Sequence, residues 1–278
     1  MEVLGVIGNP ISHSLSPKMH NAAFHVAGKE GIYIPLLVNE SQLEQAIKGA
    51  KALGFTGLNV TVPFKEKVIP YLTDLTETAE TIGSVNTIKF TEDAVIGHST
   101  DGLGFEQAAQ IELGLDFSGR KILLIGAGGA ARAITSQLLK HDCMLYITNR
   151  TYSRAQRLAS DLGKKQGHKI SVIKLEQNWL KQVIPAVDII VNTTSVGMKE
   201  TIDQTPIPTN LLHKKQTVID IIYNPKKSLL LKTAEEKGCR TQNGVGMLVW
   251  QAVKSWEFWW GVIPPLDVMY QAVKASLL

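Results

Sequence analysis

The stretch Lys121-Ile122-Leu123-Leu124-Ile125-Gly126-Ala127-Gly128-Gly129-Ala130-Ala131 decides the fold of this chain. It joins an apolar run, typical of a buried strand, to a glycine-rich turn and then to a helical pattern. The turn matches G-x-G-x-x-G/A, with Ala131 in the last position. Gly126 allows the tight turn, and Gly128 lets the backbone approach a pyrophosphate, whose charge a helix N-terminus favours. The stretch therefore predicts a dinucleotide-binding strand–turn–helix unit.

The next strand, expected near 144–148, is followed by residues that can distinguish NADP(H) from NAD. A site for NAD usually carries an acidic residue about 20 residues after the glycines, where it binds the ribose hydroxyls. Here that position holds Asn149, followed by Arg150, Thr151 and Arg154. Guanidinium groups form charge-assisted hydrogen bonds with a 2′-phosphate, whereas a carboxylate would repel it. The alternative is that both arginines are solvated helix residues. The pattern favours NADP(H) as the cofactor.

Strands and helices alternate on both sides of this unit, as is typical of α/β proteins. Upstream strands are expected near 3–7, 32–38 and 57–61. Downstream strands are expected near 170–175, 188–192 and 217–222. The alternation predicts mostly parallel sheets covered by helices on both faces. We expect two α/β domains joined near residue 100, and two further helices at the end of the chain, split at 261–265.

Composition bounds the class of protein. The chain has 278 residues, 44% hydrophobic and 19% charged, which is ordinary for a globular protein and excludes collagen-like, coiled-coil and disordered classes. The net charge of +4 is too small to predict nucleic-acid binding. Two cysteines without a CxxC motif argue against a disulfide framework and against a metal site, and favour a reducing compartment. The sequence has no signal-peptide pattern and no long apolar run, so we expect a cytoplasmic protein without a membrane partner.

Polar residues also gather at the ends of the expected N-terminal elements. Ser14 and Ser16 precede a helix predicted over 17–27, where hydroxyls suit a carboxylate. For Ser16 alone we expect plain capping of this helix. Thr61 and Lys65 follow a strand, at the edge of the sheet where open α/β folds bind ligands, and a short helix is expected over 64–72.

Asn86 and Asp101 lie at the ends of later elements. A lysine beside an aspartate makes a paired donor and acceptor for a substrate hydroxyl, so Lys65 and Asp101 are candidates for such a pair. Taken one at a time, each of these residues is better explained as a turn residue or a surface charge.

Several ordered motifs together resemble the shikimate dehydrogenase family along nearly the whole chain. The blocks are Ile11 to Pro17 with His20-Asn21, Asn59 to Lys65, Asn86-Thr87, Thr100 to Gly102, Gly126 to Ala131, Asn149 to Thr151, Asn192 to Met198, and Gly246 to Gln251. The resemblance implies NADPH-dependent reduction of 3-dehydroshikimate to shikimate, on the route to chorismate and the aromatic amino acids. It also implies a substrate-binding and catalytic domain over 1–102, a Rossmann-like NADP-binding domain over 103–240, and C-terminal helices over 241–278 that return to the first domain.

The resemblance assigns a role to each candidate residue. Lys65 and Asp101 would form the catalytic pair, with Lys65 giving a proton to the developing alkoxide and Asp101 orienting the hydroxyl and the lysine. Ser14 and Ser16 would bind the substrate carboxylate with Tyr223 near it, and ring hydroxyls would be held by Thr61, Asn86 and Gln251. The residues implied for the cofactor are Gly126, Ala127, Gly128, Gly129, Ala130, Asn149, Arg150, Thr151, Arg154, Thr193, Met198 and Gly244.

Other interpretations stay open at this point. A broader quinate/shikimate dehydrogenase, which could use NAD, would carry similar motifs. A non-catalytic NADP-binding regulator could share the fold, although it would not need Lys65 and Asp101. A folate-linked dehydrogenase of similar plan would not call for Ser14 and Ser16. Trp250 and the aromatic run 256–260 depart from the family pattern, and the chain is expected to be a monomer or a homodimer.

Overall fold

The computed structural model describes residues 1–277, and the contacts of its backbone divide the chain into two compact units. The first unit contains residues 1–104 and 248–276, and the second contains residues 105–247. The chain passes from one to the other inside α4 (Asp101–Leu113) and returns inside α9 (Val245–Trp260). The break expected after residue 240 falls within β12 (Arg240–Gln242), which pairs with the sheet of the second unit, so the observed division comes later.

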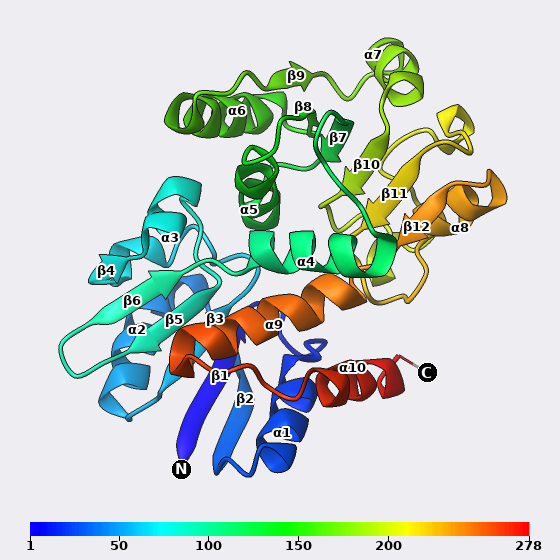
Figure 1. The fold of residues 1–278 in the computed structure, drawn as a ribbon. Helices are drawn as coiled ribbons and strands as arrows, with labels where there is room; N and C mark the ends of the chain where they lie inside the picture. The colour runs from blue at the N-terminus through cyan, green and yellow to red at the C-terminus, as the bar shows by residue number, and fades with distance from the viewer. Residues whose placement is uncertain (278) are drawn as a thin grey trace. The chain divides into compact units, whose positions relative to one another are not determined.

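The first unit is built on a six-stranded sheet of order β2-β1-β3-β5-β6-β4 (Figure 1). The strands are β1 (Glu2–Gly8), β2 (Gly31–Leu37), β3 (Gly57–Val60), β4 (Asp74–Leu75), β5 (Thr87–Phe90) and β6 (Val95–His98). β1 runs parallel to β2 and β3, whereas β5 is antiparallel to both β3 and β6. β4 is parallel to β6, so β5 alone runs against the other strands and the sheet is mostly parallel, as expected. The reversal arises because a tight turn between Thr91 and Ala94 makes β5 and β6 a hairpin.

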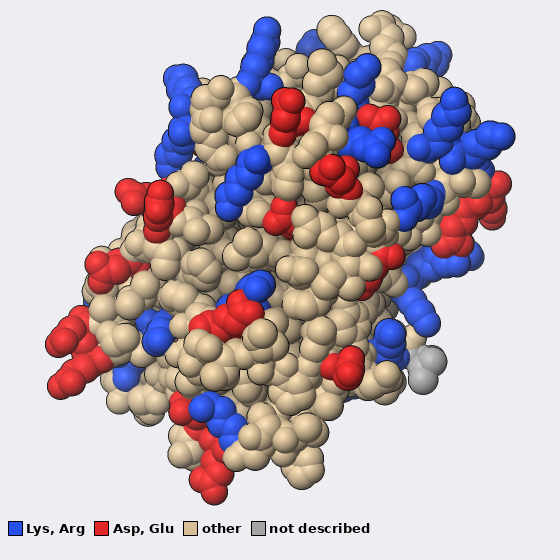
Figure 2. All heavy atoms as spheres, in the orientation of Figure 1, with Lys and Arg blue, Asp and Glu red and all other residues tan. Residues whose placement is uncertain are grey.

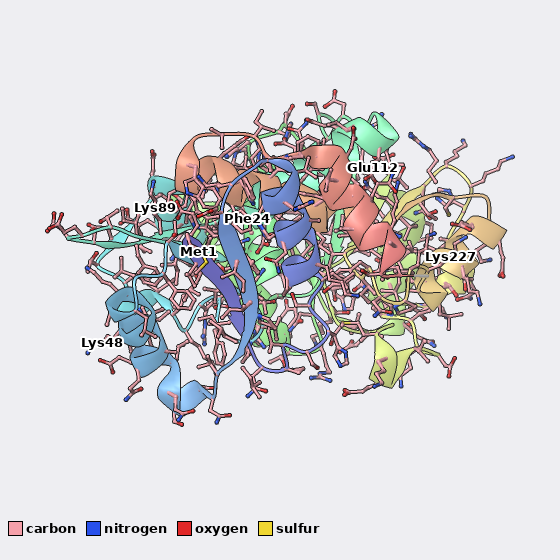
Figure 3. All side chains as sticks on the ribbon, turned by 90° about the horizontal axis from the view of Figure 1, so that it is seen from below. Met1, Phe24, Lys48, Lys89, Glu112 and Lys227 are labelled. Atoms are coloured by element: carbon pink, nitrogen blue, oxygen red, sulfur yellow. The ribbon has the colours of Figure 1, made fainter. Side chains whose placement is uncertain are left out.

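Helices flank this sheet. They are α1 (Ser16–Val26), α2 (Leu43–Ala52), α3 (Glu77–Ile82) and α10 (Leu266–Ala275), with the first turn of α4, most of α9 and the 3₁₀ turns η1 (Glu40–Gln42) and η2 (Ile69–Tyr71). α1 and α10 pack side by side, and Phe24 of α1 is buried against β2 (Figure 3). A side chain at Gly31 of β2 would approach the Phe24 ring to 2.8 Å, so this packing requires glycine.

Two local expectations in this unit are wrong. Ser16 was expected to cap α1, but the capping position is Leu15, and Ser16 is the first helical residue. The helix expected over 64–72 shrinks to the single turn η2, since Pro70 and the turns before it interrupt the pattern.

The second unit is a fully parallel sheet of order β12-β11-β10-β7-β8-β9. Its strands are β7 (Lys121–Ile125), β8 (Met144–Thr148), β9 (Ser171–Ile173), β10 (Ile189–Asn192), β11 (Thr217–Asp220) and β12. The strand order reverses at β7, and such a switch point is where doubly wound sheets bind dinucleotides. The predicted α/β class with a Rossmann-like domain is confirmed.

Both faces of this second sheet carry an apolar core. The helices are α5 (Gly129–Leu138), α6 (Tyr152–Gln166), α7 (Gln177–Val183) and α8 (Leu229–Glu236), with the rest of α4 and the 3₁₀ turns η3 (Ile184–Ala186), η4 (Lys199–Thr201) and η5 (Thr209–Leu211). α7, α8 and β12 were not expected from the sequence, because segments this short carry little periodic signal.

Charged residues of both signs are interspersed over the face drawn in Figure 2, in keeping with the small net charge. Among residues 1–277, no helix has both the length and the apolar character needed to cross a membrane. In the same range, no group of three or more His, Cys, Asp and Glu side chains is arranged to hold a metal ion.

Candidate active site and cofactor site

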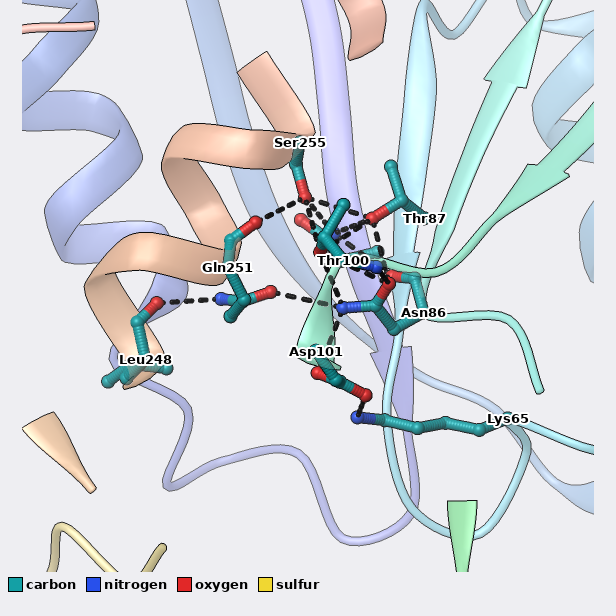
Figure 4. A network of polar contacts seen from close by, with 9 residues as sticks. Lys65, Asn86, Thr87, Thr100, Asp101, Leu248, Gln251 and Ser255 are labelled. Carbon is teal, nitrogen blue, oxygen red and sulfur yellow. Dashed lines mark hydrogen bonds and ion pairs between the residues drawn. The ribbon is translucent and has the colours of Figure 1, made fainter. Parts of the chain in front are cut away.

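A nearly buried ion pair lies at one edge of the polar cluster in the first unit (Figure 4). Nζ of Lys65 is 2.5 Å from Oδ2 of Asp101, and the two side chains are 15% and 5% exposed. Lys65 comes from the turn after β3, and Asp101 is the first residue of α4, where the helix dipole favours a carboxylate. The structure thus brings together the two residues that the sequence suggested as a donor and acceptor pair.

Asn86 connects this ion pair to the rest of the cluster. Its Nδ2 donates to Oδ1 of Asp101 at 3.0 Å, to Oγ1 of Thr100 at 2.8 Å and to Oε1 of Gln251 at 3.3 Å. Its Oδ1 accepts from the backbone N–H of Thr100 at 2.8 Å. Asn86 is buried, so these contacts fix the orientation of the amide beside the Asp101 carboxylate.

Gln251 reaches the cluster from α9. Its Nε2 donates to the carbonyl oxygen of Leu248 at 2.8 Å, which leaves Oε1 pointing at Asn86. A side chain at Gly104 would meet the backbone nitrogen of Gln251 at 2.6 Å. The glycine therefore allows α4 and α9 to approach closely enough for Gln251 to join Asn86.

A second layer of polar residues supports the cluster and extends it toward the serines. Asn59 donates through Nδ2 to the Asn86 carbonyl oxygen and to Oγ of Ser255, each at 3.0 Å. Its Oδ1 accepts from the Tyr33 hydroxyl at 2.7 Å. Burial raises the pKa of Tyr33 well above its usual value, against the opposing effect of a hydrogen bond with Ser16. This path joins Ser16 to Asn86 through Tyr33 and Asn59.

The other candidate residues of the first unit, Ser14, Ser16 and Thr61, have fewer hydrogen bonds to this cluster. The backbone N–H of Ser16 donates to Oγ of Ser14 at 3.3 Å, so the two serines form one turn at the start of α1. Ser16 is buried and Ser14 is partly exposed. Thr61 is half-buried at the end of β3, next to Gly8, where an added side chain would meet its methyl group.

In the second unit, the glycine loop lies between the end of β7 and the start of α5. Gly126 has φ of +121°, and a side chain there would meet Oγ1 of Thr193 at 2.3 Å. Gly128 caps α5 in an extended conformation, with nothing within 4 Å of the position where its Cβ would lie. Ala127, Gly129 and Ala130 complete the loop and the first turn of α5. The loop therefore leaves space for a phosphate at the helix N-terminus.

Two unpaired arginines follow β8. Arg150 and Arg154 are exposed, and neither forms an ion pair with any of the residues that the structure describes. Nδ2 of Asn149 donates to the carbonyl oxygen of Thr151 at 2.9 Å, which closes the turn before α6. The residues of this turn fit a ribose 2′-phosphate, because the guanidinium groups are free to bind it and no carboxylate stands at the end of β8.

The remaining candidates lie near the carboxyl ends of β10, β11 and β12. Thr193 donates through Oγ1 to the carbonyl oxygen of Ile125 at 2.7 Å, which places it beside the glycine loop. Met198 is 41% exposed. Gly244 lies against β11, since a Cβ there would meet the Ile221 carbonyl oxygen at 1.9 Å. Tyr223 is half-buried, and burial raises its pKa.

The sequence gives no functional role to three polar residues of these sites, Asn59, Tyr33 and Asp220. Asn59 stood inside a quoted motif, but nothing in the sequence showed that it contacts Ser255. Tyr33 and Asp220 resembled ordinary strand residues. A signal existed for Asp220 alone, because a carboxylate at the end of an apolar strand must find partners when buried.

Comparison with known proteins finds matches along nearly the whole chain. Family models match as the shikimate dehydrogenase substrate-binding domain (residues 6–88), shikimate/quinate 5-dehydrogenase (107–226) and the shikimate 5′-dehydrogenase C-terminal domain (244–274). The NADP(+) shikimate dehydrogenase of Methanopyrus kandleri is 42% identical over 99% of this chain and 96% of its own length.

Two solved structures are similarly close. A shikimate dehydrogenase in complex with NADP+ is 38% identical with a TM-score of 0.92, covering 100% of this chain and 96% of that one. The Thermus thermophilus enzyme in complex with NADP(H) and shikimate is 31% identical, with a TM-score of 0.90 and full coverage of both chains. This chain belongs to the shikimate dehydrogenase family.

Proposed function

We propose that this chain catalyses the reversible, NADPH-dependent reduction of 3-dehydroshikimate to shikimate. The observation that carries the proposal is the Lys65–Asp101 pair, which is nearly buried and held by Asn86 and Gln251. Reduction of a ketone by hydride needs a proton for the developing alkoxide, and a lysine held by a carboxylate is placed to give one. The family to which the chain belongs supplies the identity of the ketone.

Lys65 and Asp101 have separate roles in the reaction. NADPH, when bound, supplies the hydride to the ketone carbon. Lys65 gives a proton to the oxygen as the carbonyl becomes an alcohol, and takes it back in the reverse direction. Asp101 accepts hydrogen bonds from Lys65 and from Asn86, so it fixes the lysine while orienting the substrate hydroxyl. Fixed donors of this kind stabilise the alkoxide without having to reorganise during the reaction.

Substrate recognition is assigned to polar groups around this pair. Ser14 and Ser16 form a turn at the N-terminus of α1, where hydroxyls and the helix dipole suit the substrate carboxylate. Thr61, Asn86 and Gln251 offer hydroxyl and amide groups to the ring hydroxyls. Tyr223 is assigned to the vicinity of the carboxylate. On this basis the first unit is the substrate domain.

Cofactor binding is assigned to the second unit. The loop 126–130 would hold the pyrophosphate, and Asn149, Arg150, Thr151 and Arg154 would hold the adenosine 2′-phosphate. Thr193, Met198 and Gly244 are assigned to the nicotinamide half. The two unpaired guanidinium groups support NADP(H) over NAD, because a 2′-phosphate would give them a partner.

The cell compartment and the small-molecule partners complete the proposal. Both cysteines are free thiols, which suits the reducing conditions of the cytoplasm. The proposed partners are NADP(H) and shikimate or 3-dehydroshikimate, bound to a monomer or a homodimer.

The test is a rise in absorbance at 340 nm when purified protein is mixed with shikimate and NADP+. Parallel reactions contain NAD in place of NADP+, or quinate in place of shikimate. We expect rapid reduction of NADP+ with shikimate and much slower reactions in both parallels. Comparable rates with quinate and NAD would support a broader quinate/shikimate dehydrogenase. Binding of NADP+ without turnover of either substrate would overturn the proposal in favour of a regulator.

A further inference from the structure

Asp220 is a fully buried carboxylate that the proposed reaction does not use. It ends β11, and its Oδ2 accepts from Oγ of Ser228 at 2.5 Å. Its Oδ1 accepts from Nδ2 of Asn192 at 3.0 Å and from the backbone N–H of Ile222 at 3.1 Å. All three partners are neutral, so no cation offsets the cost of burying this group.

The first partner shapes the loop after β10. Asn192 is itself fully buried and lies opposite Asp220 in the parallel register of β10 and β11. Because Asp220 holds its Nδ2, Oδ1 of Asn192 faces Thr194 and accepts from the N–H at 3.0 Å and from Oγ1 at 2.7 Å. Thr194 Oγ1 in turn accepts from the N–H of Val196 at 3.2 Å. The carboxylate thereby organises the turn between Thr193 and Met198.

The other partners lie in the loop after β11. Ile222 lies near the start of that loop, and Ser228 ends it by capping α8, where its Oγ accepts from the N–H of Leu231 at 3.4 Å. The two loops also pack together, because a side chain at Gly197 would meet Cβ of Ser228 at 3.3 Å and Cδ1 of Ile222 at 3.4 Å. Asp220 therefore bonds to both loops where they touch.

Burial raises the pKa of Asp220 to about 6, against the opposing effect of its hydrogen bonds from Ser228, Ile222 and Asn192. A packed apolar side chain would avoid this cost, as buried charges are commonly replaceable by apolar groups without loss of stability. Retaining a carboxylate is understandable where its directional bonds are needed to hold a particular loop conformation.

We propose that Asp220 is a positioning residue for the nicotinamide half of NADP(H). It acts through Asn192 and Ser228, which hold the loops 193–198 and 222–228 in the conformation that presents Thr193 and Met198 to the dinucleotide. This inference rests on the proposed function, because the assignment of Thr193 and Met198 to the cofactor is part of it.

The test compares binding of NADPH with binding of 2′-phospho-ADP-ribose, which keeps the adenosine half and lacks nicotinamide. Asp220→Ala removes all three bonds, and we expect a Kd for NADPH at least tenfold higher, while the Kd for 2′-phospho-ADP-ribose stays within twofold of wild type. Asp220→Asn keeps an acceptor for Asn192 and Ile222 and a donor toward Ser228, so it should restore most of the NADPH affinity.

Gln216, next to the amino end of β11, provides a matched control. Gln216 is buried just before β11, and its Nε2 donates to the carbonyl oxygens of Ile184 at 2.6 Å and Val187 at 3.0 Å. Gln216→Ala also removes buried hydrogen bonds from the second unit, but at the amino end of the strand. It should lower thermal stability and change the affinities for the two ligands equally.

The outcomes separate this inference from the function on which it rests. Equal losses for both ligands in Asp220→Ala, or no loss for either, would overturn the positioning role. If Asp220→Ala does not fold, Thr194→Val breaks the same chain of hydrogen bonds at a partly exposed residue. It should also weaken binding of NADPH selectively, by a smaller factor. An equal change in the affinities for NADPH and 2′-phospho-ADP-ribose would overturn the positioning role. A wild-type protein that binds neither NADPH nor NADP+ would instead refute the proposed function, and the inference with it.

Discussion

Nζ of Lys65 and Oδ2 of Asp101 are 2.5 Å apart in a site that little solvent reaches. Exposed ion pairs contribute little to stability, but this one is enclosed and is bonded further to Asn86. Its arrangement is suited to chemistry because the lysine is restrained to one position, from which it can exchange a proton with a bound hydroxyl.

Replacing Lys65 should remove the proton donor and leave cofactor binding intact. For Lys65→Ala we expect kcat to fall by roughly 10²–10⁴-fold, the usual contribution of general acid–base catalysis, while the Kd for NADPH stays within about twofold, well below a tenfold or 1.4 kcal/mol change. Steady-state kinetics and a binding titration check both values. Lys67→Ala is the control, since Lys67 pairs with Glu40 at the surface. A kcat for Lys65→Ala within about threefold of wild type would contradict the assignment, given the size of ordinary acid–base effects.

The double substitution Arg150→Ala/Arg154→Ala should weaken the preference for NADP+. We expect the KM for NADP+ to rise by about 10–100-fold, as charge-assisted contacts worth roughly 1.5–3 kcal/mol in total are lost. The KM for NAD should hardly change, because NAD lacks the 2′-phosphate. Arg157→Ala, at another exposed position of α6, serves as the control. Equal effects on both dinucleotides would show that these arginines do not read the 2′-phosphate.

Gly104→Ala tests the contact that brings Gln251 to the ion pair. An added methyl group would lie 2.6 Å from the backbone nitrogen of Gln251, so α9 must move away from α4. We expect the KM for shikimate to rise at least fivefold and stability to fall by about 1–3 kcal/mol, as for other overpacked sites. Gly49→Ala is the control, because no atom lies within 4 Å of the position that its Cβ would take. Unchanged kinetics in Gly104→Ala would mean that the position of Gln251 is unimportant.

Acid should destabilise the first unit through two histidines, of which His20 is buried and His98 half-buried. Burial lowers the pKa of His20 to about 3 and that of His98 to about 4, from 6.5. Because the unfolded chain binds these protons first, stability is full above pH 6.5 and is lost as pH falls toward the folded-state values, by up to about 1.4 kcal/mol per pH unit for each histidine.

The variant His20→Gln isolates one of these groups. Glutamine can still accept the hydrogen bond that Nε1 of Trp256 donates to Nδ1 of His20 at 2.8 Å, but it does not titrate. Between pH 7 and pH 5, wild type should lose about 2 kcal/mol more than the variant in urea unfolding followed by tryptophan fluorescence. His13→Gln, at an exposed position, should follow wild type. Parallel pH dependences for wild type and His20→Gln would contradict the prediction.

Local patterns predicted much of the fold and of the site. The glycine loop, β7 and α5 followed from eleven consecutive residues, and β8 and β10 lie within one residue of the bounds that their patterns indicated. Lys65 and Asp101 were suggested as a pair because both follow elements of the same expected sheet, and the structure places them in contact. The family resemblance supplied the substrate, which no pattern of residues could name.

What could not be predicted depends on contacts between distant parts of the chain. Asn59 and Ser255 are 196 residues apart in sequence, and neither has a local signal that indicates the other. Ser16 satisfied the rule for a helix cap, yet it is the first residue of α1, and Leu15 holds the capping position. The antiparallel β5 was missed because a strand's direction depends on its neighbours rather than on its own residues.

The division of the first unit into two stretches of chain has a consequence for its synthesis. Residues 105–247 form the whole of the second unit, so this part can fold while the ribosome is still adding residues. The first unit must wait, because Gln251 and Ser255, which complete the cluster around Asn86, are translated only after the second unit. A nascent chain that extends only to Met247 would therefore contain residues 105–247 and lack the two α9 residues that complete the cluster.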